Sequence, residues 1–172
     1  MTDHLTTEQR KWNMSRVRSS DTKPEFMLRS LLHRAGFRFS LKRKDVFGKP
    51  DIVLPKYNCV IFVHGCYWHR HPGCKRATTP ATNREKWLTK FEKNVARDKM
   101  VKETLEQQGW QVIVVWECEL KKEPYTVLKS IIAAIAPEKK QKAVYSDKKE
   151  ILQVAEERFV SKFKDNKTDE KI

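Results

Sequence analysis

Residues 59–69 read Cys-Val-Ile-Phe-Val-His-Gly-Cys-Tyr-Trp-His. The first six form an unbroken run of apolar and β-branched residues, which is typical of a strand buried on both faces. After Gly65 the apolar pattern stops, and a long loop over residues 65–82 carries cysteine, histidine and aromatic side chains. A loop of this length is usually functional or held by a metal. The stretch therefore predicts a central strand that ends in chemically active side chains.

The sequence on either side of this strand completes a small α/β domain. Periodicity and turn signals predict a helix over residues 21–35, strands over 37–41 and 51–54, a helix over 83–108, a strand over 111–116 and an amphipathic helix over 124–136. Thr22 and Glu25 have the spacing of a capping box at the start of the first helix. In the long helix, Trp87, Phe91 and Val95 recur every four residues, which predicts a shared buried face. The order of elements predicts a small mixed β-sheet flanked by helices.

The chain divides into three parts around this domain. Residues 1–20 contain few aliphatic side chains and are interpreted as an N-terminal arm. Residues 21–136 hold all the predicted core elements and are short enough for one domain. Residues 137–172 form a C-terminal extension, predicted to be partly helical over 147–163, to which the sequence assigns no function.

Charge points to a polyanionic partner. The 172 residues include 36 Lys and Arg against 22 Asp and Glu, a net charge of +14, of which +12 lies in residues 1–136 (26 basic against 14 acidic). Such an excess on a small domain most often serves nucleic-acid binding, although dispersed charge also serves solubility. The sequence contains no run of 18 apolar residues and no apolar core of a signal peptide at its start, so we expect no membrane partner.

Four side chains have the types and spacing of a zinc site. Cys66, His71 and Cys74 lie within nine residues, and Cys118 follows the strand predicted over residues 111–116. If the two buried strands are neighbours, all four side chains converge at one end of the sheet. Three thiolates and one imidazole suit one tetrahedral, structural Zn²⁺. The alternative is that the thiols are simply buried at strand ends and the histidines face solvent. The fourth cysteine, Cys59, lies at a strand start and is interpreted as a core residue.

A second set of residues suits phosphodiester chemistry. Asp51 opens a strand beside the basic turn over residues 42–49, and a carboxylate in this setting is a natural Mg²⁺ ligand. His64 and His69 follow at the end of the next strand, where a histidine could serve as a general base. An aspartate after a proline is, however, more often an ordinary turn residue.

At this point the order of several short blocks resembles the very short patch repair (Vsr) endonucleases, over about residues 8–135. The blocks are Asp21-Thr22, Phe47-Gly-Lys-Pro-Asp51, the stretch 59–69, Asn94-Val-Ala-Arg-Asp98, Gly109-Trp110 and Val115-Trp-Glu-Cys118. The resemblance implies a zinc-stapled relative of the PD-(D/E)xK nucleases with an αβββαβ core. It also implies a Mg²⁺-dependent enzyme that nicks double-stranded DNA 5′ of the T in a T:G mismatch, the product of 5-methylcytosine deamination.

The resemblance also implies a role for individual residues. Asp51 would bridge two Mg²⁺ ions, with the backbone carbonyl of Val63 as a further ligand. His69 would be the general base and His64 a supporting histidine, while Glu25 would act through metal-bound water or serve only as a helix cap.

A second group of roles concerns zinc and the network around the site. The zinc ligands would be Cys66, His71, Cys74 and Cys118. Arg97 and Asp98 would orient the active-site groups. The Pro-Gly turn at residues 72–73 leaves open which of His69 and His71 is the base and which is the ligand.

The implied DNA contacts come from two regions. Tyr67, Trp68 and Trp87 would wedge into the base stack beside the mismatch, where stacking is weak. Met14, Arg16 and Arg18 of the arm would approach from the opposite groove. Two other tryptophans, Trp110 and Trp116, are interpreted as core.

The resemblance further implies a monomer in the bacterial cytoplasm, associated with the nucleoid, with mismatch-repair proteins as candidate partners. Two alternatives remain open: a restriction-type endonuclease on the same scaffold, and a non-catalytic zinc-stabilised DNA-binding module.

Overall fold

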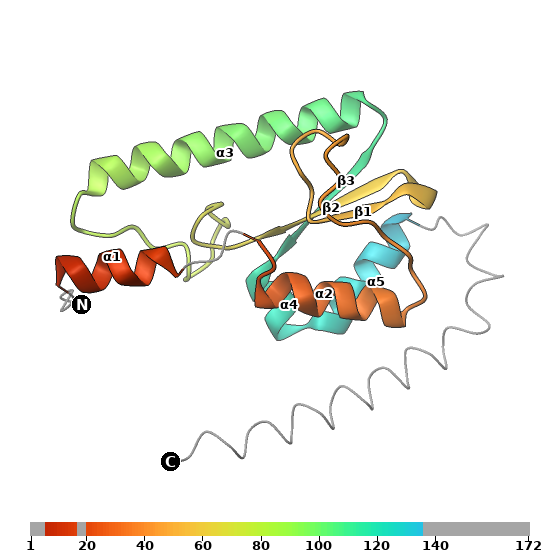
Figure 1. Ribbon diagram of the computed structural model, residues 1–172, viewed down its shortest axis with the longest axis horizontal. Helices are drawn as coiled ribbons and strands as arrows, with labels where there is room; N and C mark the ends of the chain where they lie inside the picture. Colours follow the sequence, from red (N-terminus) through yellow and green to blue (C-terminus); the bar gives the residue numbers. More distant parts are fainter. Residues whose placement is uncertain (1–5, 17–19, 136–172) are drawn as a thin grey trace, which may run out of the picture.

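A computed structural model describes residues 6–16 and 20–135 of the chain (Figure 1). Its elements in chain order are α1 (Thr7–Ser15), α2 (Lys23–Arg34), β1 (Ile52–Leu54), the 3₁₀ helix η1 (Pro55–Tyr57), β2 (Cys59–His64), α3 (Arg84–Gln107), β3 (Gln111–Trp116), α4 (Glu117–Lys122) and α5 (Pro124–Ile135). Arg18 and the extension over residues 137–172 lie outside the described residues, so the predictions made for them stay predictions.

The sheet has the strand order β1-β2-β3 and is mixed. β1 runs antiparallel to β2, and the chain reverses between them through Asn58, whose φ of 51° is left-handed. β2 and β3 are parallel over six paired positions, from Cys59↔Gln111 to His64↔Trp116. Because parallel strands end at the same edge of a sheet, the chain segments that follow His64 and Trp116 emerge side by side.

Two hydrophobic clusters cover the two faces of the sheet. Figure 1 shows α3 on one face and α2, α4 and α5 on the other. Alternate side chains of the strands point to opposite faces, so Ile52 and Ile61 pack toward α2 and α5 while Val53 and Val60 pack toward α3. This arrangement confirms the predicted small α/β domain with a mixed sheet.

The prediction of a strand over residues 37–41 is wrong. The segment contributes a single bridge, Ser40↔Val53, and is otherwise irregular. Phe37 accounts for the misleading pattern, because it is 2% exposed and packs against Tyr57 rather than serving as a strand residue. Two short helices, α1 within the arm and α4 immediately after β3, were not predicted.

The long helix α3 is buried along a different stripe from the one predicted. Phe91 is buried as expected, but Val95 is 43% exposed, and the helix packs instead through Val101 and Leu105. Positions 91, 98, 101 and 105 share one face at helical spacing, so Asp98 is turned toward the sheet.

β3 is only partly buried, because among the described strands it pairs with β2 alone. None of the described helices is both long and apolar enough to span a membrane.

Candidate metal centre and active site

The parallel pairing of β2 and β3 brings four potential metal ligands together. Cys66 follows the end of β2, and Cys118 lies in the first turn of α4, directly after β3. With His71 and Cys74 of the loop they form one cluster, in which the candidate ligand atoms all lie within 4.8 Å of one another. The predicted convergence of these four residues is therefore present in the structure.

His71 is oriented as a metal ligand would be. Its Nδ1 lies 3.2 Å from the Sγ of Cys118 and 3.7 Å from the Sγ of Cys66. On the other side of the ring, Nε2 lies 3.6 Å from a carboxylate oxygen of Glu119, which favours a proton on Nε2 and a free lone pair on Nδ1. The ring also stacks on Trp116 at 4.2 Å, so Trp116 forms a wall of this cluster, and its interpretation as core is corrected.

The donor set fits a structural zinc ion. Burial raises the pKa of the Cys66 thiol to about 12, while the pKa of Cys74 is lowered, most by its hydrogen bond with the Arg76 backbone. Without a cation, the buried thiol would stay protonated. A soft divalent ion would stabilise the thiolates and release protons as it binds.

A second cluster lies at the same edge of the sheet. The candidate ligand atoms of His64, His69 and Asp98 lie within 4.8 Å of one another, and His69 Nδ1 is 2.5 Å from Asp98 Oδ2. His69 also stacks on His64, with ring centroids 3.9 Å apart. The structure thus separates the two histidines that the sequence left ambiguous: His71 faces the thiols and His69 faces Asp98.

Burial and charge set the protonation of this second cluster. His64 is 9% exposed, and burial, followed by the nearby His69, lowers its pKa to about 4. Burial tends to raise the pKa of Asp98, but the hydrogen bond with His69 and the neighbouring positive charges together outweigh it, and the pKa is lowered. Arg97 Nη2 lies 3.4 Å from Asp98 at an exposed position, so Arg97 contacts the cluster from its rim. His64 is therefore neutral and Asp98 ionised near pH 7.

Asp51 lies directly before β1 and faces the end of β2. Its Oδ2 accepts the backbone N–H of Val63 at 2.7 Å, at a position beyond the last residue pair of β1 and β2. Burial raises the pKa of Asp51 to about 6, and the Val63 hydrogen bond opposes this rise. The charge of Glu25 raises the pKa of Asp51 further, and the charges of Arg29 and His69 lower it. A half-buried carboxylate next to strand backbone that β1 leaves unpaired offers the oxygen donors that Mg²⁺ prefers.

Glu25 is a helix cap in this structure. Its carboxylate accepts the N–H groups of Asp21 and Thr22 and the Thr22 hydroxyl, and it is only 4% exposed. The capping role predicted from the Thr22–Glu25 spacing is therefore present. Its charge also acts on Asp51, so the cap does not conflict with a role at that site.

The three predicted wedge residues form one aromatic cluster beside the histidines. Tyr67 packs edge-on against Trp68 at 5.0 Å and against Trp87 at 6.0 Å, and the two tryptophans are 5.9 Å apart. The Lys90 ammonium lies 4.8 Å from the Trp68 ring and 5.4 Å from the Trp87 ring. A cation over half-buried aromatic rings suits contact with phosphates and bases.

The arm presents one more group of exposed side chains. On α1, Met14 is 43% exposed and Trp12 is 57% exposed, with the Arg16 guanidinium 4.1 Å from the Trp12 ring centroid. Met14 and Arg16 are thus accessible at the surface, and their contact with DNA stays a prediction.

Three residues contact the site without having been predicted, namely Asn94, Lys90 and Glu119, whereas Asp98 was predicted. Asn94 donates to the backbone carbonyl of Trp68 at 3.2 Å, and Asp98, one turn later on α3, binds the next residue of the loop, His69. The four-residue spacing of Asn94 and Asp98 was a usable signal for a shared face. Glu119 and Lys90 had no comparable pattern, since their contacts depend on how α3 and α4 dock.

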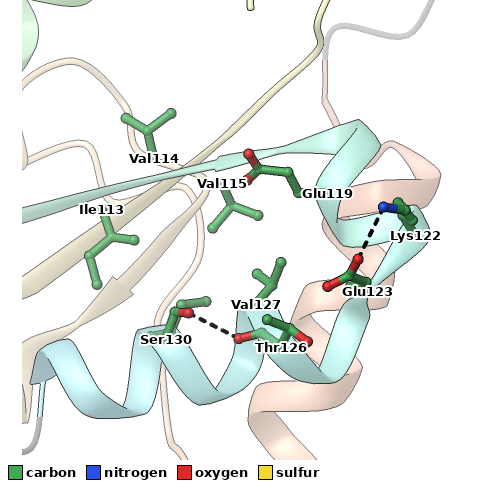
Figure 2. A pocket seen from close by; sticks show the side chains of 10 residues that line it. Ile113, Val114, Val115, Glu119, Lys122, Glu123, Thr126, Val127 and Ser130 are labelled. Carbon is green, nitrogen blue, oxygen red and sulfur yellow. Dashed lines mark hydrogen bonds and ion pairs between the residues drawn. The ribbon is translucent and has the colours of Figure 1, made fainter. Parts of the chain in front are cut away.

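An apolar hollow of about 370 Å³ lies beside the four-ligand cluster, with which it shares Glu119 (Figure 2). It opens between β3, α4 and α5, and its lining includes Ile113, Val127 and Ile131. None of the predicted site residues lines it, so it is not the candidate site.

Comparisons with known proteins agree on one family. The family described as "DNA mismatch endonuclease Vsr" matches residues 2–76. Among curated relatives, "Type II nicking enzyme V.XorIIP" of Xanthomonas oryzae is 50% identical over 120 residues, which is 70% of this chain and 88% of the relative. "Type II nicking enzyme V.NmeAIP" of Neisseria meningitidis is 47% identical over 121 residues (70% and 86%). "DNA mismatch endonuclease Vsr" of Escherichia coli is 44% identical over 109 residues (63% and 69%).

Proposed function

This chain belongs to the Vsr family of DNA endonucleases, and from that premise we propose that it nicks double-stranded DNA 5′ of the T in a T:G mismatch, in a Mg²⁺-dependent reaction. It is a DNA nicking endonuclease, and DNA is its partner. The observation that carries the finer proposal is the placement of Asp51, Val63 and the His64–His69–Asp98 cluster at one edge of the sheet, beside the aromatic cluster.

Asp51 and the Val63 carbonyl would hold magnesium, and Glu25 would approach it through water. The bound cation would stabilise the negative charge that develops on the phosphate and on the leaving oxygen. The raised pKa of Asp51 supports this role, because a cation would take the place of its proton. This set lacks the carboxylate–lysine half of the wider PD-(D/E)xK pattern, so the PD-(D/E)xK fold and the two-ion arrangement are part of the proposal.

His69 is proposed as the general base. With its Nδ1–H donated to Asp98, Nε2 is left to accept a proton from the attacking water. The Asp98 carboxylate then stabilises the positive charge that forms on the ring. His64 would support the ring by stacking, since its lowered pKa keeps it neutral beside a group that becomes charged.

Zinc at the four-ligand cluster would have a structural role. Cys66, His71 and Cys74 lie in the loop and Cys118 lies in α4, so the ion would fasten the loop over the sheet edge. His69 lies between two of these ligands in the sequence. A fixed loop would therefore hold the base in place relative to Asp98.

Mismatch recognition is assigned to the aromatic cluster and the arm. A T:G pair stacks more weakly than a matched pair, so Trp68 and its neighbours would insert there at the lowest cost. Met14 of α1 would insert from the opposite groove. The excess of positive charge would bind the phosphates and make the affinity depend strongly on salt.

Three duplexes that differ at one base pair test the proposal. The protein is incubated with Mg²⁺ and labelled DNA that carries T:G, T:A or C:G at the same position. Nicking of the T:G duplex alone, 5′ of the T, supports the proposal. Equal cutting of all three supports a restriction-type enzyme, and unchanged function in Asp51→Ala supports a non-catalytic module. Asp45→Ala, an exposed aspartate in the neighbouring turn, is the matched control.

A further inference from the structure

A buried arginine lies behind the candidate magnesium site. The side chain of Arg29 is 10% exposed, and its two terminal nitrogens bind different carboxylates: Nη1 lies 2.7 Å from Asp21 and Nη2 lies 2.7 Å from Glu25. A guanidinium is always charged, so its burial is costly unless carboxylates are paired with it, as two are here. The two contacts make Arg29 a bridge rather than the partner of one acid.

The first carboxylate belongs to the residue where the arm joins the domain. Asp21 precedes α2 and has a left-handed φ of 55°, a conformation that aspartate tolerates but that needs support. That support comes from three sides. Asp21 accepts from Arg29 and from Lys42 Nζ at 2.6 Å, and its own N–H donates to Glu25.

The second carboxylate belongs to the candidate site. The Glu25 side chain is 5% exposed, and its negative charge acts on Asp51, which is half-buried. Two carboxylates shielded from solvent in this way repel each other unless a cation lies close to them. The Arg29 charge reaches both, since it pairs with Glu25 and lowers the pKa of Asp51.

From these contacts we propose that Arg29 is a positioning residue that fixes, with one guanidinium, both the site carboxylate Glu25 and the root of the DNA-contacting arm. The part that concerns Glu25 rests on the proposed function. The part that concerns Asp21 rests only on contact between the arm and DNA, with or without catalysis, because an arm whose root is already fixed loses less conformational entropy when it binds.

The arrangement makes two measurable properties depend on one side chain. Arg29→Met removes both bridges. We expect the affinity for the T:G duplex, measured in EDTA, to fall about tenfold, because a buried hydrogen bond to a charged group is lost on the arm side. We expect a similar fall, of about tenfold, in the single-turnover nicking rate constant at saturating DNA and Mg²⁺.

Arg29→Lys and Lys102→Met serve as comparison variants. Lysine keeps the charge but is a point donor that cannot hold two carboxylates in one plane, so Arg29→Lys should restore most of the thermal midpoint but not the DNA affinity. Lys102 forms an exposed ion pair with Glu106, four residues away on α3. Arg29 and Glu25 have the same spacing on α2, but their ion pair is buried. Loss of Lys102 removes the same charge and should change the DNA affinity by less than about twofold.

A double-mutant cycle tests whether Arg29 acts on the arm through Asp21. If Arg29 acts on the arm through Asp21, Asp21→Asn should weaken metal-free DNA binding by itself but add little in the Arg29→Met background. Additive losses would overturn the proposal, and so would an Arg29→Met protein that melts earlier but binds and nicks normally at 15 °C. A wild-type protein that binds the duplex without nicking it would refute the proposed function and leave the Asp21 cycle to be judged separately.

Discussion

Replacing Asp98 by asparagine tests how the general base is held. The change keeps the size of the side chain but removes the charge that faces His69 Nδ1 at 2.5 Å. A hydrogen bond to a charged group contributes about 1.5–3 kcal/mol. Both side chains are about one-fifth exposed, so solvent weakens the interaction and the lower half of that range applies. At about 1.4 kcal/mol for each tenfold change, the nicking rate should fall roughly ten- to fortyfold.

The assay is single-turnover nicking of a labelled T:G duplex with enzyme in excess, at pH values from 5.5 to 8.5. Asp98→Asn should lower the rate constant without a matching loss of DNA affinity, because the contact acts on the base rather than on binding. Glu106→Gln, which removes an exposed carboxylate from the same helix, is the control. A rate equal to wild type in Asp98→Asn would refute the role given to the pair.

Three further predictions concern metal, pH and packing. Elemental analysis should find about one zinc per chain. Cys118→Ser should abolish zinc binding and lower the thermal midpoint of unfolding. A wild-type protein that is folded but free of zinc would contradict the zinc site. The pKa of His64 is about 4 in the folded protein and 6.5 in its ordinary, unfolded state, so the unfolded state takes up a proton first as the pH falls. The free energy of unfolding should therefore decrease between pH 6.5 and pH 4, by up to about 3 kcal/mol from this residue. His64→Gln should lose less stability than wild type in urea unfolding between pH 7 and pH 5, and equal losses would refute this. Gly48→Ala would place a Cβ 2.2 Å from Val101 at a φ of 74°, so it should lower the free energy of unfolding by about 1–3 kcal/mol, whereas an unchanged value would contradict the packing described.

The parts of the fold that could be predicted are those that local sequence determines. The run from Cys59 to His64 is apolar at every position but the last, and it forms the central strand β2. The Thr22–Glu25 spacing placed the start of α2, and the glycine after the long helix placed its end. Such signals act within a few residues, so tertiary packing does not override them.

The errors came from contacts that depend on how elements dock. Phe37 looked like a strand residue because its burial is supplied by Tyr57 and α2 rather than by a neighbouring strand. Val95 was placed on the buried face of α3, but the stripe that packs runs through Phe91 and Asp98 instead. Trp116 looked like core because nothing local to β3 reveals that His71 stacks on it from the loop.

The candidate site also combines features that local sequence predicts with features that depend on how elements dock. The spacing of Cys66, His71 and Cys74 was visible in the sequence, and the parallel pairing of β2 and β3 explains why Cys118 joins them. Which histidine faces the thiols could not be predicted, because that depends on the path of the loop around residues 69–71. The bridge made by Arg29 was also not predicted, since an arginine within a helix most often faces solvent.

The most direct test of the account is the position of the cut in a single labelled duplex. A T:G duplex labelled at the 5′ end of the T-containing strand is incubated with wild type, Asp51→Ala and Asp45→Ala, each with Mg²⁺ or with EDTA. The account predicts one product, ending immediately 5′ of the mismatched T, from wild type and Asp45→Ala in Mg²⁺ alone. The same product from Asp51→Ala, or from wild type in EDTA, would contradict it.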